Sequence, residues 1–156
     1  MPFTRSNDWI TGQKQAPIPS GPEVVSQRFT LDLATGDLAL NTIGQIGVLP
    51  AGCIPVDVHV DATDVDSGAA ALVMQVGIWD GAGANLSTAA ADGGAHWGVT
   101  TAVNTAFDQR LTMNLNAMKT VTATQAERKL GVKVTTAPTT PVAGTLGVTL
   151  FYRAAG

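Results

Sequence analysis

The sequence is short of the residues that form covalent cross-links, metal sites and membrane anchors. Cys53 is the only cysteine among 156 residues, so no disulfide can form within the chain. The only histidines are His59 and His96, which is few for a zinc or iron site. No apolar run approaches roughly 18 residues, and the N-terminus lacks the basic-then-apolar layout of a signal peptide. We therefore expect a soluble protein made in a reducing cytoplasm, with no membrane partner and no cofactor.

Charged side chains are also scarce. They make up 13% of the chain, about half the usual share, and the formal net charge is −3. The nine lysines and arginines are scattered, and no basic stripe is present to neutralise phosphates, which argues against a nucleic-acid partner. Such a weakly charged surface is expected of a protein that packs against other proteins.

The sequence does contain many short segments of alternating apolar residues. The clearest lies at residues 54–61, where Ile54, Val56, Val58 and Val60 alternate with other residues, a period typical of a half-buried strand. The predicted strands cover residues 24–31, 38–49, 54–61, 72–79, 130–134 and 146–153. We predict an all-β fold, an antiparallel β-sandwich of jelly-roll or Greek-key type. The residues expected to point inward are Val56, Val58, Val60, Met74, Val76, Ile78, Val132, Val134, Val148 and Leu150.

Helix is predicted only weakly. Residues 122–131 could form one or two helical turns capped by Thr122 or Thr124, although their apolar face is thin. Residues 81–120 read as loops with short strands, because they are rich in glycine and alanine.

Residues 1–22 are predicted to form an extended N-terminal arm, followed by a β-sandwich domain at residues 23–156. Three prolines in the arm remove backbone donors and favour extended geometry. We predict that the arm lies along a neighbouring subunit and inserts its apolar side chains into grooves there. The alternative is that it folds back on its own sandwich and covers a sheet edge. The expected contact residues of the arm are Phe3, Trp9, Ile10 and Ile18.

The stretch "IPVDVHVDATDVDSG" at residues 54–68 is conspicuously acidic. Asp57, His59 and Asp61 are predicted to share the outward face of a strand. Asp64 and Asp66 fall in a turn closed by Gly68, where aspartate bonds nearby backbone donors. A calcium loop of the EF-hand type would need a glutamate at its twelfth position, which is missing here. Calcium at a looser surface or intersubunit site remains an alternative.

The sequence gives no clear indication of catalysis. The Gly-x-Ser-x-Gly motif is absent, and "GAGAN" lacks the lysine of a phosphate-binding loop. The loop "GGAHWG" favours a contact role, so Trp97 is predicted to be an exposed contact residue. A sugar-binding platform of Trp79, Trp97 and Phe151 is a second interpretation.

Three segments together resemble the head decoration, or cement, proteins of tailed bacteriophages. They are "LPAGCIPVDVHVDATDVDSG" (49–68), "ALVMQVGIWDGAGANL" (71–86) and "TQAERKLGVKVTTAPTTPVAGTLGVTLFYRAA" (124–155). The resemblance spans residues 45–155 and rests on overall layout rather than on a catalytic motif. It implies a non-enzymatic virion structural protein that binds the outer surface of the capsid and bridges neighbouring major capsid subunits.

The resemblance also implies partners and a location. The partners would be the major capsid protein and other copies of this chain, as a trimer in which Trp97 and Phe151 contribute to the contact. The protein would be made in the host bacterial cytoplasm and act in the virion. The alternative function is a carbohydrate- or receptor-binding head or fibre domain.

Overall fold

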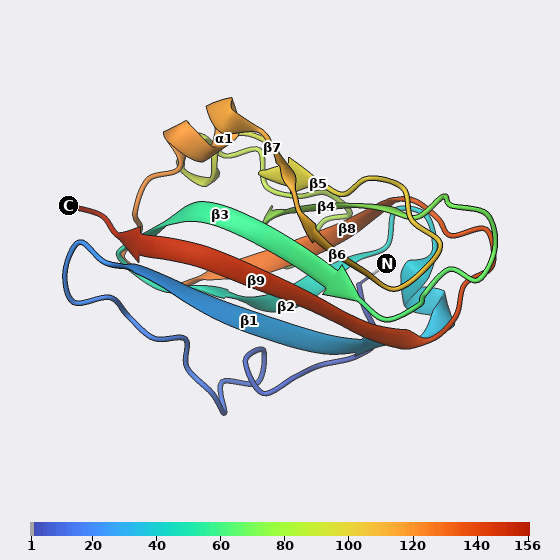
Figure 1. Ribbon diagram of the computed structural model, residues 1–156. Helices are drawn as coiled ribbons and strands as arrows, with labels where there is room; N and C mark the ends of the chain where they lie inside the picture. The colour runs from blue at the N-terminus through green and yellow to red at the C-terminus, as the bar shows by residue number, and fades with distance from the viewer. Residues whose placement is uncertain (1) are drawn as a thin grey trace.

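Two antiparallel sheets form a sandwich (Figure 1). The structure is a computed structural model that describes residues 2–156. The strand order of the first sheet is β1 (Val24–Leu33), β9 (Gly144–Ala154), β3 (Cys53–Ala62) and β6 (Phe107–Arg110). That of the second is β2 (Ile43–Leu49), β8 (Arg128–Thr136), β4 (Val73–Trp79), β5 (Gly98–Val99) and β7 (Thr112–Met113). The predicted all-β sandwich is confirmed.

The hydrophobic core lies between the two sheets. Along β8 and β9, buried residues alternate with residues that face outward, as the two-residue period of a strand requires. Leu130, Val132 and Val134 of β8 and Val148 and Leu150 of β9 are fully buried. With one exception, every residue predicted to point inward does so.

The exception is Val56, which is 43% exposed. The pairing of β3 with β9 shifts between Pro55 and Asp57, so Val56 is an extra residue without a partner on β9. Such a bulge reverses the alternation of a strand. Pro55 therefore faces inward before the bulge and Val58 after it. The strict alternation predicted for residues 54–61 is wrong in its first half.

The helices are short and lie outside the predicted place. Helix α1 (Leu115–Thr120) begins after Asn114, whose side chain accepts a bond from Ala117 N. No helix forms at 122–131, where β8 begins and pairs with β2 and β4. Two 3-10 turns complete the set, η1 (Thr35–Leu38) and η2 (Ala90–Asp92). Within residues 2–156, no helix is long and apolar enough to cross a membrane.

One open side of the sandwich is closed by a strand that changes sheets. Strand β6 belongs to the first sheet and β7 to the second, and only Leu111 separates them. Leu111 is buried, and its N–H donates to Val58 O at 3.1 Å. The opposite side, between edge strands β1 and β2, has no such strand.

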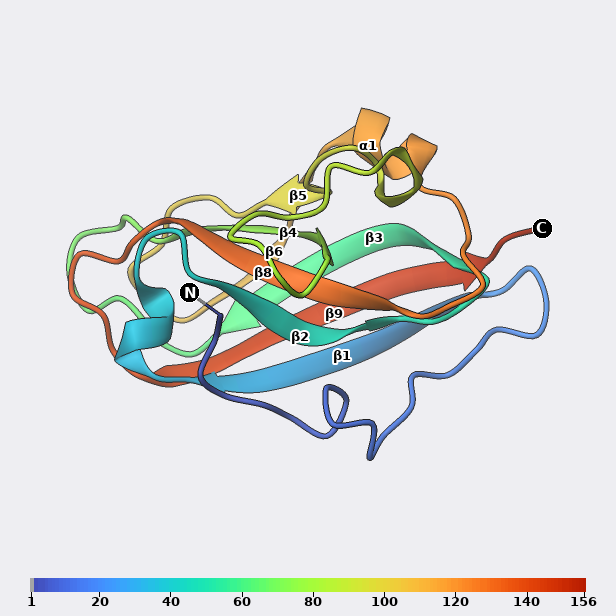
Figure 2. The same cartoon turned by 180° about the vertical axis from the view of Figure 1, so that it is seen from behind.

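The loop between β4 and β5 covers part of the outer face of the second sheet (Figure 2). Leu86 of this loop packs over Gly77 and Gly131, where an added Cβ would crowd its methyl groups. Arg128 fastens the loop, because its guanidinium pairs with Asp92 at 3.0 Å and donates to Ala91 O. The outer face of the first sheet is not covered in this way (Figure 1).

Candidate inter-subunit surface

The N-terminal arm runs along the open side of its own sandwich (Figures 1 and 2). Phe3 N donates to Ile43 O of β2 at 3.0 Å. The Phe3 ring lies over Gly44, where any side chain would collide with it. Thr4 donates from both its N–H and its hydroxyl to the buried carboxylate of Asp37, at 2.8 and 3.0 Å. The start of the arm is therefore held by the second sheet.

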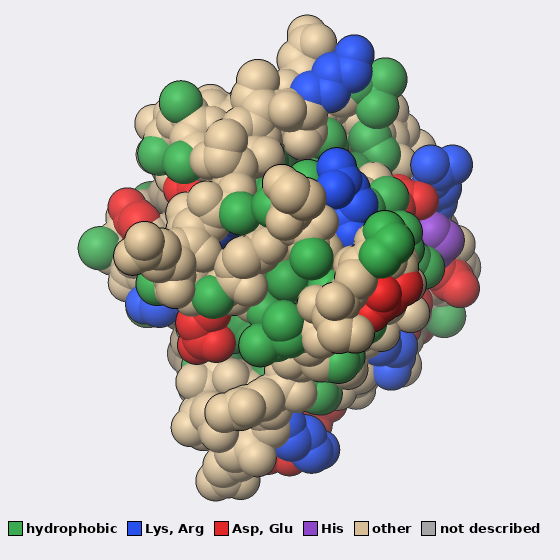
Figure 3. Space-filling view, turned by 90° about the vertical axis from the view of Figure 1, so that its left-hand side faces the viewer, with side chains coloured by type: hydrophobic (Ala, Val, Ile, Leu, Met, Phe, Trp, Pro, Cys, Tyr) green, Lys and Arg blue, Asp and Glu red, His purple; other side chains and the backbone are tan. Residues whose placement is uncertain are grey.

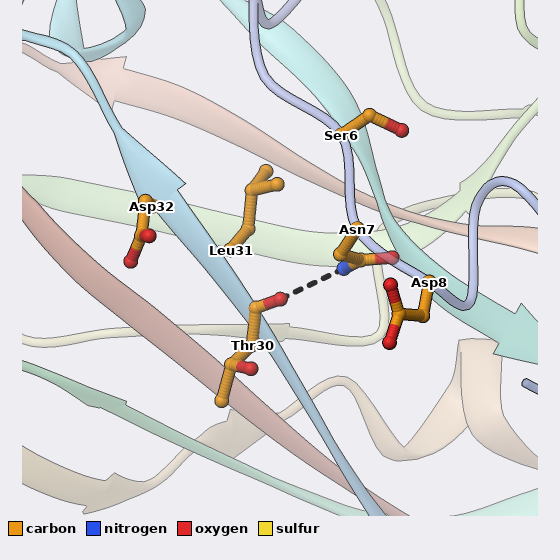
Figure 4. Close-up of a pocket in the computed structure, with 6 residues that line it drawn as sticks. All are labelled: Ser6, Asn7, Asp8, Thr30, Leu31 and Asp32. Atoms are coloured by element: carbon orange, nitrogen blue, oxygen red, sulfur yellow. Dashed lines mark hydrogen bonds between the residues drawn. The ribbon is translucent and has the colours of Figure 1, made fainter.

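Asn7 joins the two sheets. Its amide nitrogen donates to Thr30 O of β1 at 2.8 Å (Figure 4) and to Ile46 O of β2, also at 2.8 Å. Its amide oxygen accepts from Trp9 N at 3.1 Å and Ile10 N at 2.9 Å. One side chain thus satisfies peptide groups of both edge strands and orders the turn that follows.

A small polar hollow lies beside Asn7 (Figure 4). Its two carboxylates already have partners: Asp8 pairs with Lys14 at 2.9 Å, and Asp32 accepts from the Thr145 hydroxyl at 2.8 Å. Across residues 2–156, no group of three or more His, Cys, Asp or Glu side chains is placed to hold a metal ion. The hollow is therefore a junction between arm and strand whose carboxylates are already paired.

The rest of the arm is anchored by aromatic residues. The Trp9 ring meets Phe29 of β1 edge-on, with 5.3 Å between centroids. Tyr152 of β9 donates its hydroxyl to Pro17 O at 2.5 Å. Burial of the phenol, with a smaller contribution from Cys53, raises the pKa of Tyr152 to about 12. Tyr152 therefore stays protonated and able to donate at any physiological pH.

These contacts correct the predicted use of the arm. Phe3, Trp9 and Ile10 pack against the core of their own chain instead of entering the grooves of a neighbour. The physical reason is the gap between β1 and β2, which would otherwise expose core residues and the edge carbonyls of Thr30 and Ile46. Apolar residues in a proline-rich segment indicate that a groove is filled, but they do not reveal whose groove it is.

Trp97 requires a second correction. It is fully buried, and its indole N–H donates to Asp92 O at 2.8 Å. Its backbone pairs with Val76 and Asn114, which draws the glycine-rich loop into the second sheet. The expectation of an exposed contact residue is wrong, and a sugar platform that includes Trp97 is excluded in this structure. The adjacent glycines permit close packing: a Cβ at Gly98 would lie only 2.8 Å from the Cβ of Leu111.

Ile18 is the arm residue that remains exposed, at 69%. It borders a shallow apolar hollow with Ala16, Val48, Pro50 and Ala51, and we call these five residues the apolar end. Figure 3 shows hydrophobic side chains gathered near the middle of this end of the sandwich, with charged side chains around them. The apolar end is therefore a candidate contact surface.

The outer face of the first sheet is polar. Asp57 pairs with Arg110 at 2.8 Å and lies 3.8 Å from His59, and Arg28 pairs with Asp61. Phe151 is half-buried, and its ring lies 5.1 Å from that of His59. The outward placement predicted for Asp57, His59 and Asp61 is confirmed, and their charges are largely matched within the sheet.

The acidic turn is more buried than expected. Gly68 N donates to Asp66 at 3.1 Å, as predicted for a turn that Gly68 closes. Asp66 is nevertheless only 1% exposed, because Thr139 N and Thr140 N also donate to it, at 3.2 and 3.0 Å. Burial acts to raise the pKa of Asp66, but these backbone hydrogen bonds and one from Ala71 outweigh it and lower the pKa. Asp66 therefore ties two distant loops together.

Replacing Asp66 with Asn is expected to destabilise the fold by about 2 kcal/mol, because an amide cannot accept on both sides as a carboxylate does. Since folding lowers the pKa of Asp66 from its ordinary value of 3.8, the stabilisation is fully present above that pH. It is lost as the pH falls through the folded pKa. Thermal unfolding of both proteins at pH 7 and pH 3 checks this, with Asp64→Asn as the exposed control; equal melting temperatures at pH 7 would contradict it.

Comparison with known proteins places this fold among phage capsids. No protein-family model and no curated protein sequence matches the chain. Among solved structures, a chain from the capsid of Ralstonia phage GP4 is similar, with a TM-score of 0.72 and 27% identity, and the match covers 96% of each chain. A chain from the capsid asymmetric unit of cyanophage Pam1 has a similar fold, with a TM-score of 0.52 and 16% identity over 92% of this chain. The likeness to the GP4 chain supports a structural protein of a phage head, and the likeness to the Pam1 chain supports the fold.

Proposed function

We propose that the protein is a head decoration protein that binds the outer surface of a phage capsid and bridges neighbouring major capsid subunits. The observation that carries the proposal is the likeness to a chain of the GP4 capsid. Because the match covers 96% of both chains, the two proteins have nearly the same length and the whole sandwich is shared. A small sandwich of this kind is suited to adding stability to a shell from outside, and the same likeness supports a non-enzymatic role.

The surface suits attachment to other proteins. Charged residues are few, and on the outer face of the first sheet most of them are paired with one another. The apolar end offers a mainly apolar contact, with Ile18 as its most exposed side chain and Glu127 as the one charged residue that lines the same hollow. Many copies on one symmetric lattice would add avidity to a modest individual contact.

The structure weakens the case for the predicted trimer. It relied on Trp97 and Phe151 as exposed contacts, and Trp97 lies in the core. Contacts to the major capsid protein through the apolar end do not depend on a trimer. The proposed contact with the capsid therefore rests on Ile18 and its surroundings.

Replacing Ile18 with Lys is expected to weaken binding to expanded capsids at least tenfold. The loss of one buried apolar side chain, about 2 kcal/mol, and the cost of burying a charge both act in this direction. The matched control is Leu40→Lys, since Leu40 is 57% exposed and lies near the start of β2, at the other end of the sandwich. Binding is measured by co-sedimentation with capsids that lack this protein.

Two results would count against the proposal. If wild-type protein does not bind such capsids, a decoration role is wrong. If Ile18→Lys and Leu40→Lys bind equally well, the protein attaches through another surface. Melting temperatures of both variants near that of the wild type establish that the fold is intact.

A further inference from the structure

Strand β1 is an edge of the first sheet, and part of that edge is open. Its partner β9 lies on one side only. The Thr30 carbonyl bonds Asn7 rather than β9, so the peptide groups of Val24, Ser26 and Arg28, at two-residue steps from it, also face away from β9. An edge strand with free peptide groups is a template for pairing with another chain.

The arm leaves this part of the edge unpaired. Within residues 2–156, the one partner of the outward peptide groups from Val24 to Arg28 is the side chain of Gln27, which donates to Arg28 O at 2.8 Å. Val24 is 53% exposed, and Ser26 and Arg28 are exposed too. This stretch contains no proline or bulge, and its one charged side chain, Arg28, is already paired with Asp61 of the same sheet.

We propose that two copies of this chain pair antiparallel through β1, with the two-fold axis at Ser26. The outward peptide groups of Val24, Ser26 and Arg28 are symmetric about Ser26, so in this register Val24 of one copy faces Arg28 of the other. A register centred on Arg28 would bring two like charges together. A register shifted toward Thr30 would compete with Asn7 for the carbonyl that it already occupies. The Ser26 register avoids both costs and displaces only the Gln27 side chain from Arg28 O. It joins the first sheets of the two copies into one sheet that runs across the dimer.

Side chains on the outer face agree with this register. Arg28 is already paired with Asp61 of its own chain, so its aliphatic stem can cover the exposed Val24 of the partner copy. The interface would therefore combine backbone hydrogen bonds with two symmetric Val–Arg contacts. It concerns the free protein and does not depend on the proposed attachment to capsids.

Cysteine cross-linking tests the register. In a hydrogen-bonded antiparallel pair the facing Cα atoms are about 5.5 Å apart, within the range of a disulfide. Ser26→Cys is therefore expected to give a covalent dimer on mild oxidation. Val24→Cys is the matched control, because its two copies would lie roughly 14 Å apart. Native Cys53 is buried and does not compete.

A charge pair provides an independent measurement. Val24→Lys places like charges opposite Arg28 of the partner twice, whereas Val24→Glu places opposite charges there. The dissociation constant from sedimentation equilibrium is expected to be roughly tenfold higher for the Lys variant than for the Glu variant. The proposal is overturned if the wild-type protein stays monomeric at high concentration or forms a trimer. It is also overturned if Ser26→Cys does not cross-link, or if the two Val24 variants dimerise equally.

Discussion

Deleting residues 1–22 is expected to lower the melting temperature of the isolated protein by more than about 10 °C. The deletion removes the Phe3 and Trp9 rings from the core and leaves the edges of β1 and β2 without Asn7. Two partly buried aromatic rings and several hydrogen bonds together amount to roughly 5 kcal/mol, a large share of the stability of a small domain. Differential scanning calorimetry of both proteins measures the change.

A single substitution identifies the part of the arm that matters most. Asn7→Asp keeps the oxygen that accepts from Trp9 N and Ile10 N, but it replaces the donor to Thr30 O and Ile46 O with a second acceptor. We expect it to destabilise the protein by about 2–3 kcal/mol. Lys14→Ala is the control, because Lys14 is exposed and makes only a surface ion pair.

For the deletion of residues 1–22, an unchanged melting temperature would show that the arm is not part of the fold.

The sandwich could be predicted from sequence because alternation within a strand is a local signal. The two-residue period predicts which side chains point inward, and the structure buries four of them: Val132, Val134, Val148 and Leu150. The helix at Leu115–Thr120 gave a weaker signal, since six residues show too little periodicity to stand out from a loop rich in alanine.

The contact surface could not be predicted in the same way, because it depends on which distant segments meet. Nothing near Asn7 in sequence indicates Thr30 or Ile46 as partners, which lie 23 and 39 residues away. Trp97 looked exposed because it follows a glycine-rich loop, yet backbone bonds to Val76 and Asn114 draw it inside. In the sequence Ile18 is one apolar residue among several in the arm, and only the fold separates it from those that pack inward.

The β-bulge in β3 leads to the sharpest prediction about the fold. Val56→Asp and Val58→Asp are the same substitution two residues apart, and strict alternation would give them equal effects. Val58 is fully buried, so an unpaired carboxylate there should cost several kcal/mol and unfold much of the protein at room temperature. Val56 is 43% exposed and lies on the bulge, so its substitution should cost no more than about 1 kcal/mol. Asp57→Ala, which breaks an ion pair with the exposed Arg110, should also leave the fold intact. Urea unfolding followed by circular dichroism ranks the three variants, and similar midpoints for the two Val→Asp variants would show that the bulge is misplaced.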